Sequence, residues 1–131
     1  MQEALARGRQ IYLPVLHGRC LLFAPWDPAA TLAASRFGIP EPAVRLGSCL
    51  RGSQLDVVLT PLVAFDDEGH RLGMGGGFYD RTFSFSRARQ LWRKPHIIGL
   101  AYAFQRVDAL PARRWDVALH AAVTERGAKF F

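Results

Sequence analysis

Residues 55–62, LDVVLTPL, and residues 69–81, GHRLGMGGGFYDR, decide the fold of this chain. The first stretch is a nearly continuous apolar run rich in Val and Leu, which is typical of a strand buried on both faces. The second stretch leads into residues 78–92, where aromatic and basic side chains predict a helix ended by Pro95, and the apolar run HIIGLAY at 96–102 predicts another buried strand. Strand, glycine loop, helix and strand form a βαβ unit, so we expect an α/β fold with a mostly parallel sheet and flanking helices.

The sequence on either side of this unit adds short elements. Residues 1–8, MQEALARG, predict the last turns of a helix closed by Gly8, since glycine is favoured just beyond a helix end. Around His17 and Gly18, two apolar runs predict either a hairpin or two successive strands. The other expected elements are, in chain order, strands at Ile11–Leu16 and Arg19–Ala24, a helix at Ala29–Phe37, an irregular segment at Phe104–Trp115, and strands at Ala118–Thr124 and Ala128–Phe131.

Length and composition predict one globular domain over residues 1–131. The chain has a mass of 14.6 kDa, 50% of its residues are hydrophobic and 21% are charged, which allows a sizeable core. It contains no apolar run of the roughly 18–20 residues that a membrane-spanning helix needs, and its start does not resemble a secretory signal. Cys20 and Cys49 form no CxxC pair, and we expect them to be core thiols of a cytoplasmic protein.

The charge of the chain favours a polyanionic partner. The 17 Lys and Arg residues exceed the 11 Asp and Glu residues, giving a net charge of +6, and nucleic acid, nucleotide and polyglutamate all fit this excess. The basic residues are spread along the chain, and no aromatic-interleaved basic stripe or nucleic-acid module is present. The sequence also lacks a Ser/His/Asp set and a His/Cys cluster with metal-ligand spacing, which argues against nucleophilic hydrolysis and zinc chemistry.

The glycine-rich loop over residues 72–77 is the strongest indication of a binding site. Four glycines within five positions let the backbone N–H groups approach a ligand closely, and a following helix start suits phosphate. Phe78 and Tyr79 stand where a Walker A loop needs Lys and Ser or Thr, and Phe78 also replaces the third glycine of a dinucleotide fingerprint. A flexible turn remains an alternative. Arg71 is a candidate ligand for a phosphate oxygen, and Asp80 is a candidate ligand for Mg²⁺.

Taken together, these motifs resemble the 5-formyltetrahydrofolate cyclo-ligase (methenyltetrahydrofolate synthetase) family. The resemblance is carried by residues 56–66 (DVVLTPLVAFD), by the glycine stretch at 69–81, and by later short motifs, and it covers essentially the whole chain. The later motifs are Ala101-Tyr102 before Gln105, Leu110-Pro111, Trp115-Asp116-Val117 and Val123-Thr124-Glu125.

The resemblance implies an ATP- and Mg²⁺-dependent ligase of one-carbon metabolism. Members of this family convert 5-formyltetrahydrofolate to 5,10-methenyltetrahydrofolate, with release of ADP and phosphate. In the family's scheme the formyl oxygen attacks the γ-phosphate, N10 closes the ring, and phosphate leaves. The implied fold is the one shared with sugar-phosphate isomerases and CoA transferases. A reduced folate with a glutamate tail, together with ATP, then explains the positive charge better than nucleic acid does.

The resemblance also assigns roles to residues, while leaving the catalytic residues unknown. Asp80 and Asp116 match the two metal carboxylates of the family, and a reduced folate is implied to lie against the middle of the loop, with Phe78 stacking on it. The ATP-binding residues implied are Arg71, Leu72, Gly73, Met74, Gly75, Gly76, Gly77, Phe78 and Tyr79. The folate-binding residues implied are Met74, Gly75, Gly76, Gly77 and Phe78. Gln105 matches a polar position to which the resemblance gives no role.

The chain departs from the family pattern in three places. Family members begin with a further helical segment that carries a basic motif reaching ATP, and residues 3–8 correspond only to the end of that region. Trp115 replaces a usual His, and His120 replaces a common acid. The alternative function is therefore a catalytically impaired remnant that binds nucleotide. We also expect self-association through the surface that the absent segment would cover, and no membrane or nucleic-acid partner.

Overall fold

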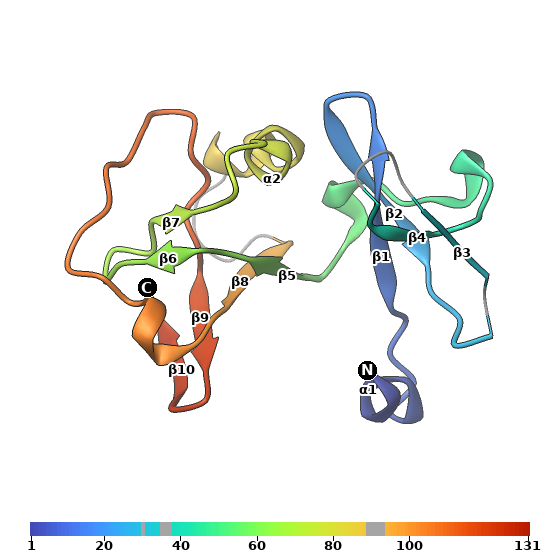
Figure 1. Ribbon diagram of the computed structural model, residues 1–131, viewed down its shortest axis with the longest axis horizontal. Helices are drawn as coiled ribbons and strands as arrows, with labels where there is room; N and C mark the ends of the chain where they lie inside the picture. Colours follow the sequence, from blue (N-terminus) through green and yellow to red (C-terminus); the bar gives the residue numbers. More distant parts are fainter. Residues whose placement is uncertain (30, 35–37, 89–93) are drawn as a thin grey trace. The chain divides into compact units, whose positions relative to one another are not determined.

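The computed structural model describes residues 1–29, 31–34, 38–88 and 94–131. These residues form two compact units, Met1–Gly52 and Ser53–Phe131, and each unit is treated separately below (Figure 1). The expected single domain over 1–131 stays a prediction.

The first unit begins with a short helix and a β-hairpin. Helix α1 (Gln2–Ala6) has Arg7 as its C-cap and is followed by Gly8, whose φ of 71° lies in the left-handed region that favours glycine. The N–H of Gly8 donates to the Leu5 carbonyl and the N–H of Arg9 to the Ala4 carbonyl, so the predicted helix end is confirmed as a Schellman motif. Strands β1 (Tyr12–His17) and β2 (Cys20–Pro25) pair antiparallel around Gly18, which confirms the hairpin alternative.

The rest of the first unit is extended and irregular. Strand β3 (Leu32–Ala34) pairs antiparallel with β4 (Pro40–Pro42), and the short 3-10 helix η1 (Leu46–Ser48) follows. A second 3-10 helix, η2 (Gly52–Gln54), spans the sequence boundary between the two units. The predicted helix at 29–37 is therefore wrong at residues 32–34, where pairing with β4 overrides the helical preference of the alanines. Residues 30 and 35–37 of that prediction lie outside the described residues.

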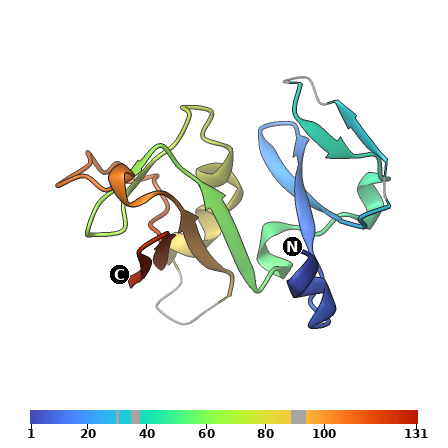
Figure 2. The same cartoon turned by 60° about the horizontal axis from the view of Figure 1, so that its bottom comes forward.

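The second unit is built on a four-stranded sheet in the order β10-β9-β8-β5. Strands β5 (Val57–Pro61), β8 (His96–Leu100) and β9 (Ala121–Thr124) run parallel, and β10 (Gly127–Phe130) pairs antiparallel with β9. Figure 2 shows β5 and β8 side by side. The expected βαβ unit between β5 and β8 is confirmed, and the sheet is small and mostly parallel.

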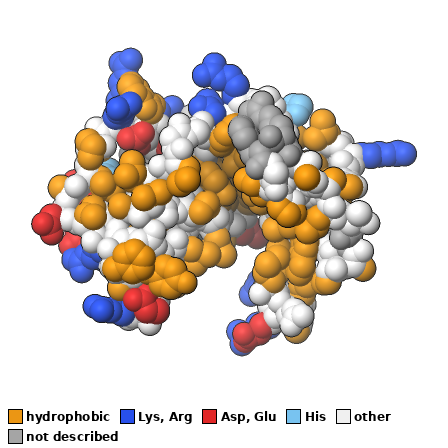
Figure 3. Space-filling model, in the orientation of Figure 1, with side chains coloured by type: hydrophobic (Ala, Val, Ile, Leu, Met, Phe, Trp, Pro, Cys, Tyr) orange, Lys and Arg blue, Asp and Glu red, His pale blue; other side chains and the backbone are white. Residues whose placement is uncertain are grey.

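One face of this sheet is covered and the other carries exposed apolar side chains. Val58, Thr60 and Ile97 are buried, whereas the alternate residues Val57 and Leu59 are 51% and 55% exposed. Because side chains alternate across a strand, the exposed set continues along paired positions to Leu100 and Val123. Hydrophobic side chains are visible at the surface over β5 and β8 (Figure 3). The prediction that residues 55–62 are buried on both faces is therefore wrong for this unit.

The helical part between β5 and β8 is shorter than the sequence predicts. A two-stranded hairpin, β6 (Ala64–Phe65) and β7 (Arg71–Leu72), precedes α2 (Phe78–Thr82) and the 3-10 helix η3 (Ser84–Ala88). The predicted helix thus starts at residue 78 but changes to 3-10 geometry after Phe83, and residues 89–93 lie outside the described residues. Another 3-10 helix, η4 (Ala103–Gln105), follows β8. The result is a mixed α/β fold in which the flanking helices are short.

The structure also bears on the burial of the two cysteines and on the presence of a membrane-spanning helix. Cys20 is exposed and Cys49 is half-buried, so the prediction that both are core thiols is wrong. Among the described residues, no helix has the length and apolar character needed to cross a bilayer.

Candidate nucleotide and metal site

The β6–β7 hairpin places Arg71 inside the second unit. Its turn is held by Asp66, whose Oδ1 accepts hydrogen bonds from the N–H groups of Glu68 (3.0 Å) and His70 (2.9 Å). Gly69 has a φ of 82°, and a Cβ at this position would lie 2.9 Å from the Leu119 carbonyl oxygen. Glycine is therefore required at this turn both for its backbone conformation and for its close approach to the neighbouring chain.

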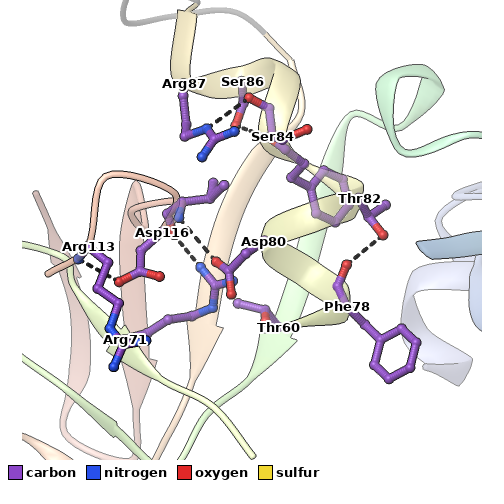
Figure 4. Close-up of polar contacts among 12 residues, drawn as sticks. Thr60, Arg71, Phe78, Asp80, Thr82, Ser84, Ser86, Arg87, Arg113 and Asp116 are labelled. Atoms are coloured by element: carbon purple, nitrogen blue, oxygen red, sulfur yellow. Dashed lines mark hydrogen bonds and ion pairs between the residues drawn. The ribbon is translucent and has the colours of Figure 1, made fainter. Parts of the chain in front are cut away.

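Arg71 forms an ion pair with Asp80 at the centre of the site (Figure 4). The guanidinium donates to Asp80 Oδ1 at 2.7 Å and also to the Val117 carbonyl oxygen. The same Oδ1 accepts the Val117 N–H at 3.1 Å. The Arg71 side chain is only 6% exposed and that of Asp80 is 29% exposed, so this ion pair is partly shielded from solvent and joins α2 to residue 117. Arg71 contacts protein groups in this arrangement.

The glycine loop between β7 and α2 lies at the surface. Residues 72–76 are exposed, and Met74 is almost fully so. Gly75 and Gly77 have φ values of 82° and 62°, a region that other residues rarely adopt, and this explains two of the four glycines. Gly77 is the N-cap of α2. Since α2 has only five residues, its dipole adds little, and the exposed loop backbone is the part suited to an anion.

The first turn of α2 carries the aromatic residues predicted to bind ligands. The Arg81 guanidinium lies 5.1 Å from the centroid of the Phe78 ring and donates to the Gly76 carbonyl oxygen at 2.7 Å, so it closes the loop onto the helix. Tyr79 stacks on Phe83, with ring centroids 6.3 Å apart. Burial raises the pKa of the Tyr79 phenol, which therefore stays neutral at physiological pH.

Asp116 directly precedes Val117 in the chain and lies near the Arg71–Asp80 ion pair (Figure 4). Its Oδ2 accepts the Arg113 N–H at 2.8 Å, whereas Asp80 uses its Oδ1 for both of its hydrogen bonds. Each carboxylate therefore has a second oxygen that a cation could approach. The described residues contain no group of three or more His, Cys, Asp or Glu side chains arranged to hold a metal. Two carboxylates suit Mg²⁺, which takes its remaining ligands from water and phosphate.

The other sequence candidates have structural partners. The Gln105 side chain donates to the carbonyl oxygens of Leu62 and Val63, both at 3.0 Å, and accepts the Tyr102 N–H at 2.7 Å, so it anchors η4. The Trp115 ring is half-exposed and lies 5.5 Å from the Arg113 guanidinium carbon.

His120 contacts the sheet, where its Nδ1 accepts the Ile97 N–H at 3.0 Å. Burial and the nearby His96 lower the pKa of His120, which keeps the ring neutral at pH 7. His120, which directly precedes β9, thus links the start of that strand to β8.

The sequence analysis did not single out Asp66 as a functional candidate. It belongs to the polar stretch DDEG at 66–69, a composition that is typical of a turn. The structure buries this residue, where its Oδ2 accepts the Leu110 N–H at 3.0 Å and contacts His70 Nδ1 at 2.9 Å. An acid in a run of polar turn residues after a strand gives no signal that distinguishes a buried carboxylate from an exposed one.

Comparison with known proteins agrees with the resemblance seen in the sequence. The sequence profile of the 5-formyltetrahydrofolate cyclo-ligase family matches residues 1–125. The chain is 46% identical over 129 residues to the 5-formyltetrahydrofolate cyclo-ligase of Escherichia coli K12, covering 95% of this chain and 68% of that protein. It is 44% identical over 124 residues to the Haemophilus influenzae protein of the same name, covering 91% of this chain and 63% of that protein.

Solved structures agree as well. The NMR structure of Aquifex aeolicus 5,10-methenyltetrahydrofolate synthetase superposes with a TM-score of 0.77 at 33% identity, covering 98% of this chain and 61% of that chain. The 5,10-methenyltetrahydrofolate synthetase from Mycoplasma pneumoniae gives a TM-score of 0.62 at 25% identity, covering 92% of this chain and 59% of that chain. The chain thus spans roughly two thirds of the length of the relatives that it matches.

The fold and the loop define an α/β protein with a mostly parallel sheet and a glycine-rich loop between a β-hairpin and a short helix. Within that class, the chain belongs to the 5-formyltetrahydrofolate cyclo-ligase family.

Proposed function

We propose that this chain carries the nucleotide loop and metal carboxylates of a 5-formyltetrahydrofolate cyclo-ligase and performs ATP- and Mg²⁺-dependent closure of 5-formyltetrahydrofolate to 5,10-methenyltetrahydrofolate. The observation that carries the proposal is the exposed glycine loop next to the Arg71–Asp80 ion pair, in a chain that is 46% identical to a curated family member. ADP and phosphate are the other products.

The loop residues supply the phosphate contacts in this proposal. Residues 71–79 bind ATP, chiefly through exposed backbone N–H groups of the glycines, and residues 74–78 also lie against the folate. Phosphoryl transfer needs the reacting groups to be positioned and their charge neutralised more than it needs covalent chemistry by the protein. The positive φ values of Gly75 and Gly77 support this role, because glycine adopts this backbone conformation easily and has no Cβ that would keep a ligand away from the backbone.

Asp80 and Asp116 hold Mg²⁺ in this proposal. When bound, Mg²⁺ neutralises phosphate charge as the phosphoryl group is transferred. Asp80 keeps its carboxylate in place through the Arg71 guanidinium and the Val117 N–H, and Asp116 is fixed by the Arg113 N–H. The hydrogen bonds of each carboxylate thus orient its second oxygen before any cation arrives. The solvent exposure of Phe78 is intermediate, which supports its role in stacking on the folate.

Turnover by the purified full chain tests this proposal. We expect formation of methenyltetrahydrofolate, followed by its absorbance, only when 5-formyltetrahydrofolate, ATP and Mg²⁺ are all present, with one ADP released per folate closed. Absorbance growth without ATP would contradict the mechanism. A folded chain that binds ATP in calorimetry but closes no folate would contradict the catalytic proposal and support a nucleotide-binding remnant instead.

Three sequence-based expectations stay predictions alongside this function. The first is self-association, for which the exposed apolar side chains on one face of the β5–β8–β9 sheet provide support. Light scattering tests it, and a mass equal to the monomer would contradict it. The second is a cytoplasmic location, and the third is the likeness to sugar-phosphate isomerases and CoA transferases.

A further inference from the structure

Asp66 is a buried carboxylate that joins two parts of the second unit far apart in sequence. Its side chain is 3% exposed, and a buried charge is costly unless its oxygens are hydrogen-bonded. Oδ1 serves the hairpin itself, through the N–H groups of Glu68 and His70. Oδ2 contacts His70 Nδ1 and accepts the N–H of Leu110, 44 residues away. The hydrogen bonds keep the Asp66 pKa below its usual range, although burial opposes this, so the group is ionised at neutral pH.

The residue that Asp66 contacts lies in a segment with no regular structure of its own. Residues 107–119 contain no helix or strand. The β6–β7 hairpin holds this segment near both ends, since the Val107 N–H donates to the Phe65 carbonyl at 2.9 Å and the Leu119 N–H donates to the Gly69 carbonyl at 2.8 Å. Between these two, Asp66 adds a contact at Leu110, and the Arg71 guanidinium adds another at the Val117 carbonyl oxygen.

The same segment carries the second metal carboxylate of the proposed site. Asp116 precedes Val117, whose N–H and carbonyl oxygen are bound by Asp80 and Arg71. Arg71 itself belongs to the hairpin that Asp66 stabilises. The place of Asp116 relative to Asp80 therefore depends on how firmly the hairpin holds residues 107–119.

We infer that Asp66 is a positioning residue, whose buried carboxylate joins the β6–β7 hairpin to the 107–119 segment and so sets Asp116 opposite Asp80. This inference rests on the proposed function for its ligand, Mg²⁺–ATP. Asp66 touches neither the nucleotide nor the metal in this account. It acts through Leu110 and the hairpin.

The substitution Asp66→Asn distinguishes the role of Oδ1, which binds the hairpin, from the role of Oδ2, which binds Leu110. An amide oxygen at the Oδ1 position still accepts the N–H groups of Glu68 and His70, so the turn is kept. The amide NH₂ then faces the Leu110 N–H, and two donors cannot bond to each other. The contact with His70 is kept, because the imidazole can adopt the tautomer in which Nδ1 has no proton and accepts a hydrogen bond from the amide NH₂. The variant therefore removes mainly the contact with the 107–119 segment.

Asp67→Asn is the matched control. Asp67 is the next residue, its side chain is 46% exposed, and it pairs with Arg106 and Lys129 at the surface. Exposed ion pairs contribute little to stability. This control removes the same negative charge, one residue further along the chain, without removing the contact with Leu110.

The experiment combines amide hydrogen exchange with ATP binding in the full chain. In the wild type we expect a protected Leu110 amide. In Asp66→Asn we expect the Leu110 and Val117 amides to exchange about tenfold faster or more. The gain in ATP affinity on adding Mg²⁺ should fall about tenfold, while Mg²⁺-free ATP binding changes less than twofold. Asp67→Asn should match the wild type in all three.

An unprotected Leu110 amide in the wild type overturns the inference whether or not the variant folds. So does an Asp66→Asn protein whose Leu110 exchange and Mg²⁺ response equal those of the wild type. Faster exchange with an unaltered Mg²⁺ response also overturns it, since Asp66 would then be structural only. If the wild type itself fails to bind Mg²⁺–ATP, the proposed function fails, and the exchange data still decide whether Asp66 holds the segment.

Discussion

Replacing Phe83 with alanine is expected to lower the free energy of unfolding by about 3–5 kcal/mol, the usual cost of deleting a buried aromatic side chain. Phe83 follows α2 directly and is only 1% exposed. Its ring stacks on Tyr79 and packs against Phe85, with centroids 6.3 and 6.1 Å away. Because Asp80 belongs to the same short helix, loss of this anchor should also loosen the site. Urea denaturation followed by circular dichroism measures the effect.

Phe104→Ala is the matched control for this prediction. Phe104 is 81% exposed and stacks on Tyr102 at the surface, with ring centroids 5.7 Å apart. Its replacement should change the free energy of unfolding by less than about 1 kcal/mol. Equal losses for the two alanine variants would contradict the view that Phe83 anchors α2 in the core.

Replacing Asp80 with alanine should cost about 2–4 kcal/mol of unfolding free energy, because it leaves the Arg71 guanidinium buried without its anionic partner. This range lies below the usual cost of breaking a buried pair, since the Asp80 side chain is 29% exposed and solvent screens part of the interaction. Asp80→Asn should cost less than half as much, because its amide oxygen still accepts from Arg71 and from the Val117 N–H. Thermal and urea unfolding of both variants measure these differences.

Asp116→Ala controls for the loss of a carboxylate in the same site. The Asp116 carboxylate accepts the N–H of Arg113, only three residues away (Figure 4), so its replacement should cost less than about 1 kcal/mol. A larger loss at Asp116 than at Asp80 would show that the Arg71–Asp80 pair is not the structural centre of the site.

The sequence predicted the elements that periodicity and glycine chemistry control. Apolar runs located β5 and β8, and the parallel pairing between them follows from the loop and helix that separate them. Gly8 marked a helix end correctly, and Gly18 marked a turn for which the hairpin was one of two alternatives, because a positive φ is a local requirement. The family resemblance also followed from the motifs around residues 56–81, and the comparisons bear it out.

The wrong predictions concern residues whose structure depends on tertiary contacts, which a short stretch of sequence does not contain. Leu32–Ala34 forms a strand because Pro40–Pro42 is available to pair with it. Val57 and Leu59 looked like core residues, yet within their unit only the opposite face of the sheet is covered. Asp66 contacts Leu110, 44 residues away, and Arg71 contacts Val117, 46 residues away. No local pattern shows that the turn acid Asp66 and the strand arginine Arg71 are buried and hydrogen-bonded to a distant segment.

The Mg²⁺ dependence of ATP binding tests the central claim most directly, which is that the glycine loop, Asp80 and Asp116 form one magnesium–nucleotide site. Calorimetry would compare ATP binding with Mg²⁺ and with a chelator in the wild type, in Asp80→Asn, in Asp116→Asn, and in the exposed-acid control Asp108→Asn. We predict at least about tenfold tighter binding with Mg²⁺ in the wild type and the control, equivalent to about 1.4 kcal/mol, and loss of most of this gain in both site variants. ATP binding that ignores Mg²⁺, or an undiminished gain in both site variants, would contradict the account.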